Sequence, residues 1–173
     1  MTMERKLQYF EIAGNMPYGL HVKDRVLRSK DEPAVITSIL GITWPILSAE
    51  RKNIIMYINL ADIIPVLRPF SDLYRTISHN EQEIIPIVEL AKICDKHKNW
   101  VLGNECAVCN TSNYYFGYNG DFMFYNLSLI RLSHISNKYQ LFDYLNSIFI
   151  DYRGLIDAGL AIDANTLESN PYK

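Results

Sequence analysis

Three cysteines and one histidine in the middle of the chain have the residue types of a zinc site. Cys94-x-x-His97 and Cys106-x-x-Cys109 would supply two ligands each. Only eight residues separate the two pairs, which is shorter than the spacing in the common zinc fingers and ribbons. Cys94 also falls on the apolar face of a predicted helix, where a free cysteine behaves as a small hydrophobic residue. We therefore predict no metal site and no cofactor, and we leave open whether these four residues bind a metal.

The sequence lacks the patterns that would indicate an enzyme. It has no G-x-S-x-G, P-loop, dinucleotide fingerprint or EF-hand pattern. Cys106 and Cys109 have no basic cluster nearby in the sequence that would activate a thiol. Asp72 is interpreted as a helix cap, and the histidines are scattered. We expect a protein without enzymatic activity, and a pocket that gathers His134, Asp72 and a cysteine would contradict this.

Arg68 has the clearest capacity to bind a ligand. It lies between Val66-Leu67 and Pro69-Phe70, so the sequence places a cation in an apolar neighbourhood. A guanidinium can present a planar fork to a carboxylate or phosphate. The alternative is an internal pair with Asp62 or Asp72, because buried charges are usually paired. Tyrosine combines a large contact area with a polar tip, and the predicted ligand-binding set is Arg68, Tyr18, Tyr115 and Tyr118.

Two aromatic segments around Asn119-Gly120 predict a β-hairpin over residues 114–126. Asn-Gly favours a two-residue type I′ turn, which needs φ > 0 at both central residues. A two-residue loop would pair Tyr118 with Asp121 and Phe116 with Met123. Both faces of the hairpin would then be apolar or aromatic. One face should pack on the core, and the other needs a helix or a partner as its cover.

The N-terminal half of the chain has the pattern of a small β-structure. A short helix within residues 4–13 and a turn at Met16–Leu20 precede the strands. Short strands are predicted over residues 19–23, 34–42, 54–58 and 63–67. They indicate a small curled sheet or SH3-like barrel, and the alternative is an open meander covered by the first helix.

Helical patterns dominate the rest of the second half. One helix begins at Pro86 and buries Ile87, Leu90, Ala91 and Cys94. A second helix is predicted over residues 138–152, followed by an extended tail over residues 160–173. We predict an α+β protein with a strand-rich lobe over residues 1–75 and an α+β lobe over residues 76–173, in which the two helices pack the aromatic hairpin.

Composition limits the class of partner. Of the 173 residues 49% are hydrophobic and 21% charged, as in an ordinary globular protein, and the net charge is −2. Without a basic run, general binding to duplex nucleic acid or to an anionic membrane is disfavoured. No apolar stretch approaches the ~20 residues that span a bilayer, and no signal peptide pattern is present. Three cysteines, an odd number, favour a reducing compartment, so a cytoplasmic location is expected.

Three separate segments together resemble a known pattern. They are Met16–Leu20 (MPYGL), Pro65–Leu73 (PVLRPFSDL) and Gly154–Asp163 (GLIDAGLAID). They are similar to an uncharacterised protein family of tailed phages and prophages of gut Bacteroidales, whose pattern is PYGL, ILRPLSDL and GLIDAGLAID. The resemblance implies a phage-encoded protein made in a bacterial cytoplasm. It carries over no catalytic residue, and the three cysteines are not part of it.

The expected function is that of a non-enzymatic binding protein acting in the host cytoplasm, with a role in host takeover or anti-defence. Its partner would be a host protein or a small nucleotide-like ligand held by Arg68 and the tyrosines. The alternative is a virion or assembly component, in which a homo-oligomer would bury the aromatic surface. A third hypothesis is an enzyme that acts on nucleotides or nucleic acid.

Overall fold

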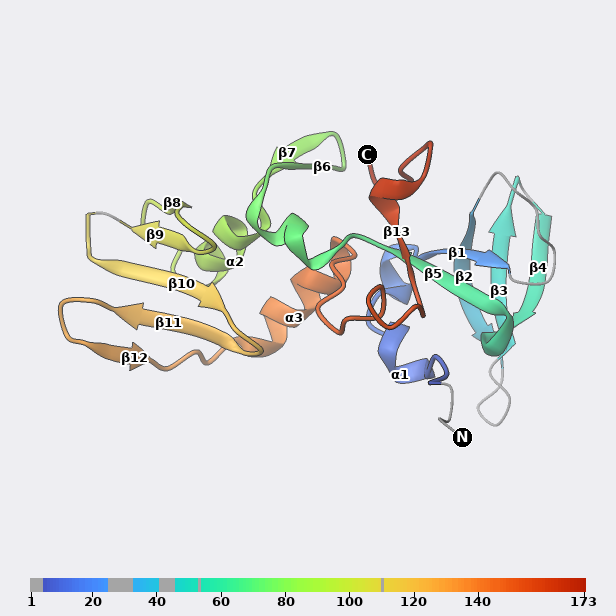
Figure 1. The fold of residues 1–173 in the computed structure, drawn as a ribbon, viewed down its shortest axis with the longest axis horizontal. Helices are drawn as coiled ribbons and strands as arrows, with labels where there is room; N and C mark the ends of the chain where they lie inside the picture. The colour runs from blue at the N-terminus through green and yellow to red at the C-terminus, as the bar shows by residue number, and fades with distance from the viewer. Residues whose placement is uncertain (1–4, 25–32, 41–45, 53, 110) are drawn as a thin grey trace. The chain divides into compact units, whose positions relative to one another are not determined.

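The computed structural model of the chain describes residues 5–24, 33–40, 46–52, 54–109 and 111–173 (Figure 1). Its mixture of helices and largely antiparallel sheets confirms the α+β class. The chain divides into two compact units, which are described one at a time. Unit 1 comprises Met1–Phe70 and Asn146–Tyr172, and unit 2 comprises Ser71–Leu145 and Lys173. This division differs from the predicted lobes 1–75 and 76–173, because the last part of the chain belongs with the N-terminal part.

Unit 1 is built on a six-stranded sheet in the order β13-β5-β1-β2-β3-β4. Its strands are β1 (His21–Asp24), β2 (Ala34–Leu40), β3 (Ile46–Arg51), β4 (Ile54–Asn59), β5 (Ile63–Leu67) and β13 (Ile162–Asp163). Strands β1 to β4 form an antiparallel meander, the 3₁₀ turn η2 (Leu60–Asp62) follows, and β5 returns to pair with β1. The SH3-like closure into a barrel stays a prediction, because the described pairings form one sheet with β13 and β4 at its edges.

Two short helical segments precede this sheet. The helix α1 (Tyr9–Ile12) is shorter than the predicted one, and it begins with a capping box in which the Gln8 amide donates to the Glu11 carboxylate at 2.7 Å. The 3₁₀ turn η1 (Met16–Tyr18) ends at Gly19, whose φ is +79°. A turn at this position agrees with the prediction.

The expectation of an extended tail over residues 160–173 is wrong. This segment adds β13 in parallel beside β5, forms the 3₁₀ turn η4 (Ala164–Thr166) and buries Tyr172. The buried residues that this segment contributes to the core of unit 1 are Leu160, Ala164 and Tyr172, beside Phe149 and Leu155 from the residues just before it. Burial of a large apolar side chain stabilises a fold by about 1.5–3 kcal/mol, so this segment is a substantial part of the core.

The predicted helix over residues 138–152 is also too long. The helix α3 (Lys138–Ser147) ends five residues earlier, and Phe149 has a φ of +62°. Beyond it the chain turns extended and pairs with Arg68: the Arg68 amide donates to the Phe149 carbonyl at 2.8 Å, and the Asp151 amide donates to the Arg68 carbonyl at 2.9 Å. Backbone pairing with a distant residue therefore replaces the last turn of the predicted helix.

Unit 2 contains a five-stranded antiparallel sheet in the order β12-β11-β10-β9-β8 and a separate hairpin, β6–β7. Its strands are β6 (Ile77–His79), β7 (Gln82–Ile84), β8 (Val101–Leu102), β9 (Ala107–Cys109), β10 (Tyr114–Tyr118), β11 (Phe122–Asn126) and β12 (Arg131–Ser133). The 3₁₀ turn η3 (Phe70–Tyr74) lies at the boundary of the unit.

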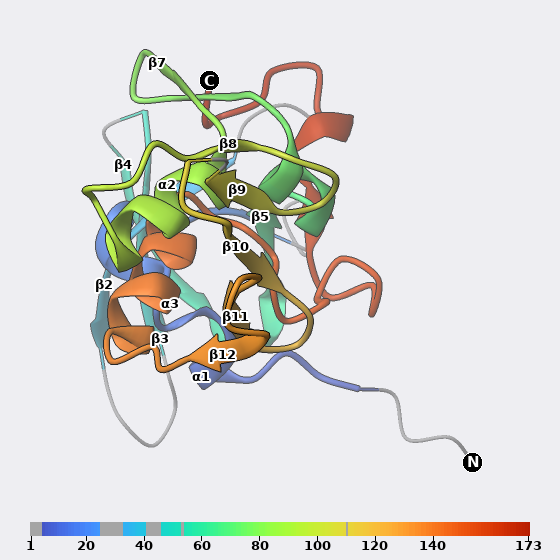
Figure 2. The same ribbon diagram turned by 90° about the vertical axis from the view of Figure 1, so that its left-hand side faces the viewer.

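Two helices lie on one side of the five-stranded sheet (Figure 2). The helix α2 (Pro86–Cys94) begins at Pro86 as predicted and buries Ile87, Leu90 and Ala91 completely. It contacts β8, β9 and β10, while Phe142 of α3 contacts Phe122 of β11. Within the part of the chain that the structure describes, no helix is long and apolar enough to cross a membrane.

Candidate functional site

The aromatic hairpin forms in the predicted place, but its pairing differs from the prediction by one residue. Tyr118 pairs with Phe122 and Phe116 pairs with Phe124, so the loop has three residues instead of two. Within the loop Gly120 has a positive φ of +73°, whereas Asn119 does not, so the turn is not type I′. Asp121 stays in the loop because its carboxylate accepts a hydrogen bond from the Phe122 amide at 2.8 Å and forms an ion pair with Lys138.

This register decides which aromatic residues face the helices. Phe116 and Phe122 are buried, and their rings lie 5.8 Å apart in a stacked arrangement. The Phe122 ring meets the edge of Phe142 at 4.9 Å, and Trp100 meets Phe124 at 5.9 Å. Side chains alternate between the faces of a strand, so these residues form the inner face of the sheet, which packs against the helices.

The opposite face of the sheet carries a continuous apolar row. Strand pairing places one residue from each of the five strands side by side: Val101, Val108, Tyr115, Tyr125 and Leu132. We call this row, together with Met123, the outer face. Leu132 is 63% exposed and Val101 is 43% exposed, while the residues between them are half-buried. The Tyr115 and Tyr125 rings lie 5.5 Å apart and cover each other in part.

Gly117 lies beside these rings in the outer face. It pairs with Met123, and a Cβ at this position would lie 3.6 Å from the Tyr115 ring and 3.9 Å from the Met123 methyl group. The turn between β11 and β12 adds three more exposed apolar residues, Leu127, Leu129 and Ile130. The outer face and this turn therefore present apolar groups that the described residues of unit 2 leave in contact with solvent.

Arg68 is buried in unit 1, with 2% of its surface exposed. Its guanidinium donates a hydrogen bond to the backbone carbonyl of Tyr172 and lies 5.5 Å from the centre of that ring. Such an enclosed guanidinium offers no surface to a ligand. The burial of Arg68 favours the alternative of an internal role, and the Tyr172 carbonyl is one of its internal partners.

The three predicted ligand-binding tyrosines lie in different parts of the fold, and the two in unit 2 are on opposite faces of the sheet. Tyr18 is 40% exposed and lies in η1 of unit 1. Tyr115 belongs to the outer face of the sheet in unit 2. Tyr118 is on the inner face, where its ring meets the edge of Phe122 at 5.0 Å and its carbonyl accepts a hydrogen bond from Tyr74 at 3.4 Å. Only Tyr115 therefore lies in the apolar row that the strands build.

The four residues with zinc-ligand spacing do not converge. Among the described residues, no group of three or more His, Cys, Asp or Glu side chains is placed to hold a metal ion. Cys94 packs in α2 within 3.9 Å of the Asn137 side-chain oxygen, and burial with the nearby Asp95 raises the pKa of its thiol to about 11. Cys109 of β9 pairs with Tyr114 on the inner side of the sheet, whereas Cys106, which precedes β9, lies 3.9 Å from the position of a Cβ on Gly117 at the other side.

The buried thiol of Cys109 contacts the Ser112 hydroxyl at 3.0 Å and the Thr111 hydroxyl at 3.3 Å. Burial raises the pKa of Cys109, but the hydrogen bonds from Ser112 and Thr111 together lower it below its ordinary value. With 1% of the residue exposed, this thiol is closed to a substrate. Asp72 is buried and forms an ion pair with Arg75, while His134 is exposed.

Sequence reasoning found the central aromatic strands of the outer face but missed its two ends. Val101 and Val108 belong to strands of two and three residues, which carry almost no periodic signal. Leu132 belongs to β12, a strand of three residues that follows a turn over residues 127–130. The row could be traced across the sheet only from the pairing between its strands, which no local sequence pattern reports.

Comparisons with family models, with curated proteins and with solved structures found no match to this chain.

Proposed function

We propose that the chain is a phage-encoded, non-enzymatic binding protein that acts in the host cytoplasm and binds a host protein through the outer face of unit 2. The observation that carries this proposal is the apolar row across five strands, with an exposed residue at each end. Exposed apolar surface of this kind is typical of protein interaction sites. The phage origin and the role in host takeover or anti-defence rest on the sequence resemblance alone.

A protein partner suits this surface better than a small nucleotide-like ligand. The outer face is a sheet surface of valine, leucine, methionine and tyrosine and carries no cation for a phosphate. Arg68, the cation on which the nucleotide hypothesis depended, is buried in the other unit. Tyrosine and methionine are enriched in the cores of protein interfaces, where an apolar ring is buried and the hydroxyl bonds at the rim.

The test uses two exposed ends of the row. A Val101→Glu/Leu132→Glu double variant adds two carboxylates to the outer face, and both positions tolerate a polar side chain because they are exposed. Tyr139→Glu is the matched control, since Tyr139 is 82% exposed and lies on α3, outside the sheet. The wild type, the double variant and the control are each immobilised and incubated with a Bacteroidales lysate. The captured proteins are quantified by mass spectrometry.

A candidate partner is then purified, and its dissociation constant is measured with each chain. We expect binding to weaken at least tenfold in the double variant and to stay unchanged in Tyr139→Glu, because a tenfold change needs only about 1.4 kcal/mol and a desolvated carboxylate costs more than that. Equal binding by all three folded chains would exclude the outer face as the contact surface.

The alternative function is that of a virion or assembly component. The same apolar row favours it, because neighbouring copies in a particle would cover the surface. Mass spectrometry of purified phage particles separates the two functions: a chain present at constant stoichiometry in particles supports the structural role, and its absence from them supports the cytoplasmic role.

A further inference from the structure

Strand β4 is an unusual edge in the sheet of unit 1. An edge strand presents unpaired backbone N–H and C=O groups, and proteins usually protect it by making it short, charged or interrupted by proline. Among the described sheets, every other edge strand has two or three residues, whereas β4 has six. Its pairing with β3 is regular from Ile54 to Asn59, and in the described residues β4 pairs with no other strand.

The side chains of β4 lack the usual protection as well. The segment Ile54–Asn59 contains neither a charged residue nor proline. Ile54 is 64% exposed, Ile55 is 63% exposed and Tyr57 is 69% exposed. Ile55 and Tyr57 lie on the same face of the strand, opposite the buried Ile58, so a strand added at this edge would bring apolar groups beside them.

We propose that β4 is a homodimerisation edge, at which two copies of the chain pair their β4 strands antiparallel and extend the sheet across a two-fold axis. The occupant is a second copy because an antiparallel pair of identical strands is self-complementary. Each strand then offers the other the same row of backbone groups and the same Ile55 and Tyr57 side chains.

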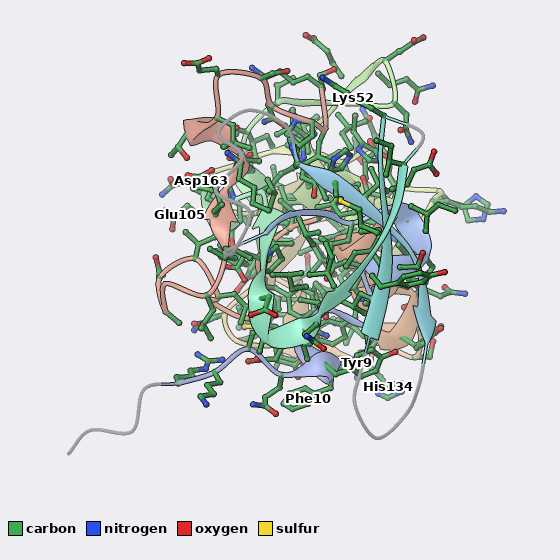
Figure 3. All side chains as sticks on the ribbon, turned by 90° about the vertical axis from the view of Figure 1, so that its right-hand side faces the viewer. Tyr9, Phe10, Lys52, Glu105, His134 and Asp163 are labelled. Atoms are coloured by element: carbon green, nitrogen blue, oxygen red, sulfur yellow. The ribbon has the colours of Figure 1, made fainter. Side chains whose placement is uncertain are left out.

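The charges at the two ends of β4 favour this arrangement. Lys52 is exposed at the tip of the β3–β4 hairpin (Figure 3), and Asp62 follows the other end of the strand in η2. Antiparallel pairing centred on Tyr57 brings the Lys52 end of one copy beside the Asp62 end of the other. Parallel pairing would instead set like charges side by side. Opposite charges across an interface fix its register more than they raise its affinity.

The expected dimer is weak. Stable interfaces bury about 800 Å² on each partner, and a six-residue strand with a few side chains provides less than that. Sedimentation velocity from low micromolar to submillimolar concentration should therefore show the sedimentation coefficient rising from that of a monomer to that of a dimer. Hydrogen exchange of the β4 amides should slow over the same concentration range.

The variant Tyr57→Lys places a charge at the centre of the edge and should keep the chain monomeric throughout. Ile55→Lys serves in its place if Tyr57→Lys is not folded. Ile130→Lys is the control, since Ile130 is 80% exposed and belongs to unit 2, and it should dimerise like the wild type. The single change Lys52→Asp should weaken the dimer, and the double change Lys52→Asp/Asp62→Lys should restore it.

A wild-type chain that stays monomeric at the highest concentration overturns the proposal. So does a dimer that persists in folded Tyr57→Lys and Ile55→Lys. The outer-face variant Val101→Glu/Leu132→Glu should dimerise like the wild type, and loss of the dimer in that variant would assign self-association to the outer face instead. The test of dimerisation through β4 therefore does not depend on whether the outer face binds a host protein.

Discussion

Tyr172 organises a cluster of aromatic and charged side chains in unit 1. Its hydroxyl donates to the Val66 carbonyl at 2.6 Å, and its ring stacks on Phe149 at 4.1 Å between centroids. His21 meets the edge of the same ring at 5.2 Å, and its amide donates to the Tyr172 hydroxyl at 3.3 Å. Arg68 bonds to the Tyr172 carbonyl. Arg68, which the sequence suggested as a ligand-binding residue, thus helps to hold the last part of the chain to the sheet.

Within this cluster His21 is the group that responds to pH. Its Nδ1 is buried and has no hydrogen-bond partner among the described residues, and burial lowers the pKa of His21 below its ordinary value of 6.5. Protonation in place would add a cation on the same tyrosine ring as Arg68. The unfolded chain binds the His21 proton at a higher pH than the folded chain does, so the free energy of unfolding decreases as pH falls.

We expect this loss of stability to begin as the pH falls through about 6.5 and to end below the lowered pKa of the folded state. Urea unfolding followed at several pH values between 8 and about 5 measures it. His21→Gln should flatten the profile, whereas His134→Gln should not, because His134 is exposed. Identical pH profiles for the wild type and His21→Gln would show that other groups cause the dependence.

At the scale of elements, the turn sequence fixes where the hairpin forms, and contacts with other residues fix its register. Asn119-Gly120 marks the turn correctly, yet the strands pair one residue further along than a two-residue loop would require. A shift of one residue in the pairing exchanges the partners of every aromatic side chain. Phe122 packs against Phe142, and Asp121 of the loop forms an ion pair with Lys138. Both partners are residues of α3, outside the turn sequence, and these contacts favour the three-residue loop.

The glycine of this loop provides a test at the same scale. Gly120 has a φ of +73°, and a Cβ added there would meet no atom within 4 Å, so only backbone conformation matters. Gly120→Ala should therefore lower the free energy of unfolding of the hairpin region by about 1 kcal/mol. Gly120→Asn should cost less, because asparagine tolerates the left-handed region. Hydrogen exchange of the β10 and β11 amides measures both changes, and an equal cost for both variants would contradict a purely conformational role.

At the scale of the whole molecule, unit 1 is assembled from two distant parts of the chain. Val66 and the hydroxyl of Tyr172 are hydrogen-bonded although 106 residues separate them in the sequence. The boundary predicted near residue 75 cuts such contacts, since it leaves Phe149, Leu155, Leu160 and Tyr172 in the other piece. The chain is therefore organised by contacts of long sequence separation, and its first half is an incomplete unit.

A fragment that ends at residue 75 should consequently not fold on its own. We expect a poorly dispersed amide spectrum by NMR and no cooperative thermal transition, whereas the full chain shows both dispersion and a transition. Adding a peptide of residues 146–172 to the fragment should recover part of the dispersion, because it supplies the missing core residues. A well-dispersed, cooperatively unfolding fragment would contradict the assignment of residues 146–172 to unit 1.

The sequence by itself determined the α+β class, the helix from Pro86 to Cys94 and the existence of the aromatic hairpin. These depend on local signals: a proline at a helix start, apolar residues at helical spacing, and an Asn-Gly turn. Strand β3 (Ile46–Arg51) is absent from the predicted strands because its second half is polar and charged, although Leu47 and Ala49 are fully buried.

Only the tertiary structure decided the register of the hairpin, the burial of Arg68 and the place of residues 146–172. Each of these results from pairing or packing between residues that are far apart in the sequence, and no local pattern encodes which distant partner a side chain meets. The outer face has the same origin, because its row of side chains exists only once the five strands have taken their register.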